Sequence, residues 1–113
     1  MVARMTMNKT TVEQKIQAIV DKIVKEYQPE KIILFGSWAW GEPHEDSDVD
    51  FFIVKESDKD VIERMREVYK IIFGSGIPTD VLVYTPHQTE QRLNLGDPFL
   101  KKIFNSGKIL YAK

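Results

Sequence analysis

The sequence contains no cysteine, and this absence excludes a disulfide framework, a thiolate zinc site and a cysteine nucleophile. It also fits the reducing cytoplasm, where we expect the protein to act. No apolar run approaches the roughly 18 residues that a membrane span needs. Residues 1–11 lack the apolar centre of a secretory signal. We therefore expect a cytoplasmic protein without a membrane partner.

An excess of positive charge is missing as well. Sixteen Lys and Arg residues stand against 17 Asp and Glu residues, which gives a formal net charge of −1. A protein that grips a phosphate backbone usually carries a basic stripe, and no such stripe stands out here. The charge balance therefore argues against nucleic acid as the main partner.

The length of the chain limits its organisation. With 113 residues, 42% of them hydrophobic and 29% charged, the sequence predicts one ordinary globular domain over residues 1–113. There is no room for a catalytic domain and a separate substrate domain. If the protein is an enzyme, another component must help to hold its substrate.

Apolar residues at helical spacing and short apolar runs between turn residues predict alternating helices and strands. We expect helices before Pro29, from Val61 to Ile72, and after Pro86 and Asp97. Strands are expected at residues 31–35, 49–55, 79–84 and 108–111, with one helical turn near residues 38–40. This order predicts a single α/β or α+β layer structure.

The dipeptide Gly36-Ser37 directly follows the first predicted strand. Glycine permits close approach of the backbone, and Ser37 is expected to cap a helical turn whose free amides point at an anion. A phosphate group would fit at this place. A strand followed by Gly-Ser is common, however, and a plain turn is the more frequent interpretation.

Two carboxylates lie at the start of the second predicted strand. Residues two apart in a strand share a face, so Asp48 and Asp50 are expected to project side by side. Such neighbours repel each other, and Mg2+ would relieve that repulsion through oxygen ligands. A solvated acidic turn is the alternative. It suits Glu42, Glu45 and Asp46 well, but it suits Asp48 and Asp50 less well because these two adjoin the apolar strand.

Asp80 repeats this pattern at the start of the third predicted strand. If the second and third strands are neighbours, Asp48, Asp50 and Asp80 converge. Three such carboxylates suit two-metal phosphoryl transfer, in which Asp80 helps to deprotonate the attacking hydroxyl. Taken alone, Asp80 could equally be an exposed residue at the start of a strand.

The stretch LFGSWAWGEPHEDSDVDFFIV, Leu34–Val54, resembles the signature of nucleotidyltransferases of the DNA polymerase β superfamily. That resemblance implies a small mixed sheet with helices mainly on one face. The small size is similar to the minimal nucleotidyltransferases, which act as antitoxins of helical HEPN-domain toxins. It implies transfer of AMP from ATP, with Mg2+ (two ions), to a tyrosine of the partner. The implied catalytic and metal-binding residues are Asp48, Asp50 and Asp80, and the implied nucleotide-binding residues are Gly36, Ser37 and Ser47.

The sequence departs from this family at Trp38-Ala39-Trp40, where many relatives carry a basic residue. Lys31, Lys55 or a partner could supply the missing phosphate contact. The two tryptophans could stack on a base, pack under the loop or face a partner.

Other functions remain open besides protein adenylylation. The protein could be a non-enzymatic antitoxin that neutralises its partner by binding alone. Transfer to a small molecule ranks last, because the chain lacks the length for an acceptor-binding domain. We expect association with a helical partner or with a second copy.

Overall fold

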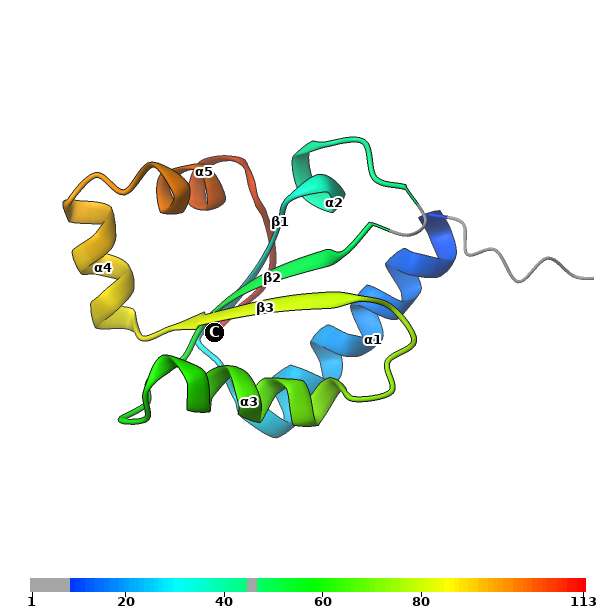
Figure 1. Ribbon diagram of the computed structural model, residues 1–113, viewed down its shortest axis with the longest axis horizontal. Coiled ribbons are helices and arrows are strands. Elements are labelled where there is room, and N and C mark those ends of the chain that lie inside the picture. Colours follow the sequence, from blue (N-terminus) through cyan, green and yellow to red (C-terminus); the bar gives the residue numbers. More distant parts are fainter. Residues whose placement is uncertain (1–8, 45–46) are drawn as a thin grey trace, which may run out of the picture.

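The computed structural model describes residues 9–44 and 47–113 (Figure 1). Helices and strands alternate as the sequence predicted, with boundaries within two residues of the expected ones. The elements in chain order are α1 (Lys9–Tyr27), β1 (Lys31–Phe35), α2 (Ser37–Trp40), β2 (Val49–Val54), α3 (Val61–Ile72), β3 (Thr79–Tyr84), α4 (Pro86–Asn94), α5 (Pro98–Ser106) and β4 (Lys108–Ala112).

The four strands form one mixed sheet in the order β3-β2-β1-β4. β2 and β3 run parallel because α3 carries the chain back across the sheet between them. β1 is antiparallel to both β2 and β4. The start of β2, the start of β3 and the end of β1 therefore lie at one end of the sheet.

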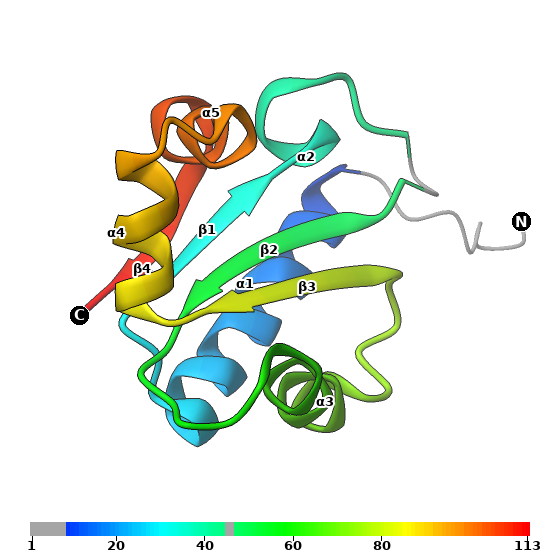
Figure 2. The ribbon, with the colours of Figure 1, turned by 60° about the vertical axis from the view of Figure 1, so that its left-hand side comes forward.

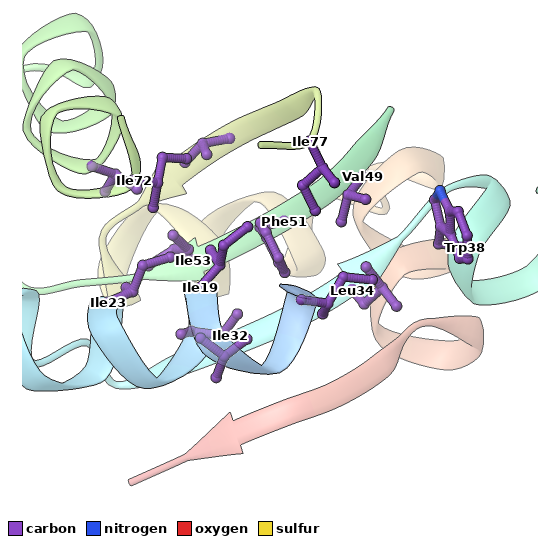
Figure 3. Close-up of a cluster of buried hydrophobic side chains, with 14 of the residues drawn as sticks. Ile19, Ile23, Ile32, Leu34, Trp38, Val49, Phe51, Ile53, Ile72 and Ile77 are labelled. Carbon is purple, nitrogen blue, oxygen red and sulfur yellow. The ribbon is translucent and has the colours of Figure 1, made fainter. Parts of the chain in front are cut away.

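The two long helices cover one face of this sheet (Figure 2). Ile19 and Ile23 of α1 pack with Ile72 of α3 against Phe51 and Ile53 of β2 (Figure 3). Their spacing of three or four residues on the helices and two on the strand places them on facing surfaces. The larger of the two hydrophobic clusters thus lies on the face that α1 and α3 cover, and the predicted small mixed sheet with packed helices is confirmed.

A smaller cluster covers the other face, where α4 and α5 lie (Figure 2). Leu100 and Ile103 of α5 are fully buried against Ile33, Phe52 and Val54. Along β2, residues alternate between the two clusters, so Asp50 shares the α5 face with Phe52 and Val54. The second face is thus covered by helices as well, though less extensively.

Polar caps fix where three helices begin. Asp60 accepts a hydrogen bond from a backbone N–H in the first turn of α3, and Asp97 accepts two in α5. Thr85 and Gln88 form a capping box at α4. Within residues 9–44 and 47–113, no helix is both long and apolar enough to cross a membrane.

Candidate active site

Three aspartates meet at the end of the sheet where β2 and β3 begin. Asp50 and Asp80 lie directly opposite each other across the parallel strands, and Asp48 precedes β2 by one residue. On its other side Asp50 is paired with Phe35, the last residue of β1. The structure thus brings together the three carboxylates that the sequence singled out.

The mutual proximity of these carboxylates changes their acidity. Burial, together with the nearby charges of Asp80 and Asp48, raises the pKa of Asp50 to about 6. Burial and the charge of Asp48 also raise the pKa of Asp80. In the described part of the chain, no Lys or Arg forms an ion pair with any of the three. The cluster therefore carries negative charge that a cation would stabilise.

The donor chemistry of this cluster fits Mg2+, because every ligand atom is a carboxylate oxygen. Among the residues that the structure describes, no three His, Cys, Asp or Glu side chains already surround one metal position. The carboxyl of Asp80 instead lies within hydrogen-bonding reach of Asp48 and Asp50. The donors fit the ion, whereas a coordination shell would require the side chains to turn away from one another.

Gly36 brings the backbone against this cluster. Its φ of +76° lies in the left-handed region, and a Cβ atom at this position would collide with the carboxyl group of Asp50. Gly36 is also the N-cap of α2, and its carbonyl accepts hydrogen bonds from Ala39 and Trp40. The expectation that Ser37 caps this turn is wrong, because Ser37 is the first residue of the helix and no side chain caps it.

Trp38 connects α2 to the segment that precedes Asp48. Its indole is 8% exposed within the cluster beneath α1 and α3 (Figure 3), and its Nε1 donates to the carbonyl of Ser47 at 3.2 Å. The Ser47 hydroxyl accepts the backbone N–H of His44 at 2.8 Å. Of the three roles left open for Trp38, packing under the loop is the one observed. Glu45 and Asp46 lie outside the described residues.

Trp40 lies on the opposite face, among aromatic residues of β1 and α5. Its ring centroid is 6.4 Å from that of Phe35, which in turn makes an edge-on contact with Phe99 at 5.6 Å. The ammonium of Lys102 lies 4.7 Å from the centre of the Trp40 ring. This arrangement depends on how α5 packs against β1, and nothing in the local sequence indicated it.

Lys31 and Lys55 lie at the other end of the sheet. Lys31 is paired with Val54, whereas Asp50 is paired with Phe35, four residues further along β1. At about 3.3 Å per residue, roughly 13 Å of strand separates these positions. Lys55 directs its ammonium to the ring of Tyr27 at that far end. The idea that either lysine contacts phosphates held by the aspartates therefore does not agree with the structure.

Known proteins resemble this chain over most of its length. A family model described as "Nucleotidyltransferase domain" matches residues 16–111. The "putative protein adenylyltransferase" of Methanocaldococcus jannaschii is 29% identical over 101 residues, which cover 88% of this chain and 97% of that protein.

Solved structures share the fold. A "putative nucleotidyltransferase" from Sulfolobus solfataricus matches with a TM-score of 0.62 and 20% identity, over 97% of this chain and 94% of its own. A toxin–antitoxin structure with AMP-PNP matches with a TM-score of 0.54 and 20% identity, over 86% of this chain and 73% of its own.

Proposed function

Because the chain belongs to the nucleotidyltransferase domain family, we propose that it transfers AMP from ATP to a tyrosine hydroxyl of a partner protein. The observation that carries this proposal is the pairing of Asp50 with Asp80 across β2 and β3, beside the backbone of Gly36. The name of the Methanocaldococcus jannaschii relative, a protein adenylyltransferase, supports a protein acceptor.

The transfer requires one bond to form and one to break. The acceptor oxygen attacks the α-phosphorus of ATP, the bond from that phosphorus to the bridging oxygen breaks, and pyrophosphate leaves. The hydroxyl proton passes to Asp80, which is exposed and whose pKa is raised above its ordinary value. Asp80 is therefore accessible to a substrate at the edge of the cluster.

Asp48, Asp50 and Asp80 would hold Mg2+, with two ions as the expected number. When bound, the metal neutralises the carboxylates and the charge that develops on the phosphates. Asp50 is the ligand most affected by its absence, because burial and two neighbouring carboxylates oppose its ionisation. The proposal thus explains why like charges are placed together at the edge of an apolar core.

Gly36, Ser37 and Ser47 are proposed to contact the nucleotide. The missing Cβ of Gly36 lets the start of α2 approach phosphates bound at Asp50. The hydroxyl of Ser47 accepts the N–H of His44, so its own hydrogen can be donated to a phosphate oxygen. Together these groups would orient ATP, with its α-phosphate toward the carboxylates.

The proposed partner is a helical HEPN-domain toxin, which the protein would inactivate by adenylylation. One protein of this fold is part of a toxin–antitoxin and was crystallised with AMP-PNP, which supports both the nucleotide and the type of partner.

Intact-mass spectrometry tests this function directly. The protein is incubated with ATP, Mg2+ and the product of the neighbouring gene, in parallel with Asp50→Asn and with Asp58→Asn as a matched exposed control. A gain of AMP masses on the partner, lost in Asp50→Asn but kept in Asp58→Asn, is the expected result. A stable complex without any mass change would contradict the enzyme and favour neutralisation by binding alone.

A further inference from the structure

Lys102 belongs to α5, the helix that packs on the same face of the sheet as Asp50, and its ammonium lies against Trp40 of α2. Asp50 alternates with Phe52 and Val54, which pack under α5, the helix that carries Lys102. Figures 1 and 2 both show α5 beside α2, the turn that follows Gly36. A nucleotide bound at Asp50 that extended along α2 would therefore approach α5, the helix that carries Lys102.

Packing holds this lysine in place. Leu100 and Ile103 on either side of it are fully buried, which fixes the orientation of α5 against β1. Trp40 positions the ammonium at 4.7 Å from its ring centre, while the Lys102 side chain remains exposed. The charge is thus ordered and also accessible to a ligand.

The site needs such a charge. Three carboxylates without a basic partner would face a triphosphate that brings several further negative charges, so cations beyond Mg2+ would favour binding. Lys31 and Lys55 lie at the far end of the sheet. Lys108 is paired with Leu34, whose side chain belongs to the opposite face. The contact with Trp40 instead places Lys102 next to α2.

From this geometry we infer that Lys102 contacts the β- and γ-phosphates of ATP and that Trp40 serves as its support. The α-phosphate stays at Asp50 and Asp80, and the pyrophosphate moiety extends along α2 toward α5. Lys102 then determines the preference for a triphosphate over a monophosphate. This inference rests on the proposed nucleotidyltransferase function and adds to it the residue that recognises the leaving group.

Calorimetric titration of the full chain with AMP-PNP or AMP, each with Mg2+, separates this role from a structural one. The variants are Lys102→Gln, which keeps most of the stem over Trp40, the conservative Lys102→Arg, and Lys101→Gln as the adjacent exposed control. We expect Lys102→Gln to weaken AMP-PNP binding about tenfold, the loss of one charge-assisted hydrogen bond. Binding of AMP should change less than about twofold, and Lys102→Arg should restore most of the AMP-PNP affinity.

Three results would overturn the inference, and they can be told apart. If wild-type protein, Lys102→Gln and Lys101→Gln bind AMP-PNP equally, Lys102 has no role in the triphosphate site while the proposed function stands. If wild-type protein binds neither nucleotide, the proposed function and the inference both fail. A loss that is the same for AMP and AMP-PNP would indicate disturbed packing of Trp40 and would also contradict a phosphate contact.

Discussion

The two ends of the sheet treat charge in opposite ways. Where β2 and β3 begin, Asp48, Asp50 and Asp80 cluster without a basic partner among the described residues. Where β2 and β3 end, Lys59 forms an ion pair with Glu67 at 2.5 Å. An unpaired cluster costs stability and has to be maintained by function, whereas the paired groups stabilise the fold.

A buried arginine shows how thoroughly the far end is satisfied. Arg64 is 4% exposed, and it donates to the carbonyls of Val83 and Lys59 and to the side-chain oxygen of Gln88. It thereby joins α3 to β3 and to the start of α4. No corresponding cation reaches into the aspartate cluster in the described part of the chain.

The groove and the aspartate cluster lie at opposite ends of the sheet. A groove of about 610 Å3 opens where β2 ends. Val54, Leu93 and Phe104 lie in its wall, and charged residues of both signs surround it. The aspartates do not line it. Unbalanced charge, rather than the volume of a cavity, therefore marks the end of the sheet at which we propose phosphoryl chemistry.

The largest effect is expected for a substitution in the aspartate cluster. Asp50→Asn keeps the shape of the side chain but removes a proposed metal ligand, so we expect the transfer rate to fall by at least about 10³-fold. A quantitative adenylylation assay measures it, with Asp58→Asn retaining the wild-type rate. Activity of Asp50→Asn within tenfold of wild type would contradict the assignment of the cluster as the active site.

The next largest effect is expected for Arg64, at the end of the sheet where β2 and β3 end. Arg64→Ala leaves two carbonyls and one amide oxygen without their donor in a buried place, which should cost about 3 kcal/mol of unfolding free energy. Urea denaturation measures this change. Arg66→Ala is the control, because Arg66 is exposed and forms an ion pair with the exposed Glu63, and it should cost no more than about 0.5 kcal/mol. Equal losses would show that Arg64 does not stabilise this end.

Trp38→Phe tests how Asp48 is positioned without changing any charge in the aspartate cluster. It keeps an aromatic ring in the core but removes the hydrogen bond to the Ser47 carbonyl, for a loss of about 1–2 kcal/mol in stability. Because Ser47 precedes Asp48, transfer should also slow. Trp40→Phe leaves that bond intact, so denaturation and the transfer assay on both variants are compared. A transfer rate unchanged by Trp38→Phe would mean that Asp48 is positioned without this bond.

Much of this arrangement could be predicted from the sequence because it depends on short spacings. Two-residue spacing predicted that Asp48 and Asp50 share a face at the start of the second strand, and the observed pairing of β2 with β3 places Asp80 opposite Asp50. The cap at Ser37 was wrong because Gly36, in a left-handed conformation, already occupies the N-cap.

Features that depend on tertiary packing could not be predicted in this way. The contact between Lys102 and Trp40 joins residues that are 62 positions apart and follows from how α5 lies on β1. The burial of Arg64 had a signal that was missed, since it lies at helical spacing between Val61 and Val68 on the apolar stripe of α3. Its charge suggested solvent, but its position indicated the core.

The smallest expected effect is the stability that the aspartate cluster costs. The pKa of Asp50 is raised from its ordinary 3.8 to about 6. The folded chain thus binds this proton more tightly than the unfolded chain. The resulting stabilisation is present below about pH 4 and is lost as the pH rises through about 6. Solvent screening of this partly exposed group reduces the loss from at most roughly 3 to about 1 kcal/mol.

Asn is neutral at every pH. The free energy of unfolding of Asp50→Asn should therefore be about 1 kcal/mol higher than that of wild type near neutral pH with EDTA present. The difference should shrink toward about pH 4, while Asp58→Asn should follow wild type throughout. Urea denaturation across this range measures all three proteins. If Asp50→Asn were the least stable at neutral pH, the Asp50 carboxylate would be a stabilising group, and the contrast between the two ends of the sheet would be lost. A gain in stability with a loss of transfer would instead show that the aspartates are kept together for chemistry at the expense of the fold.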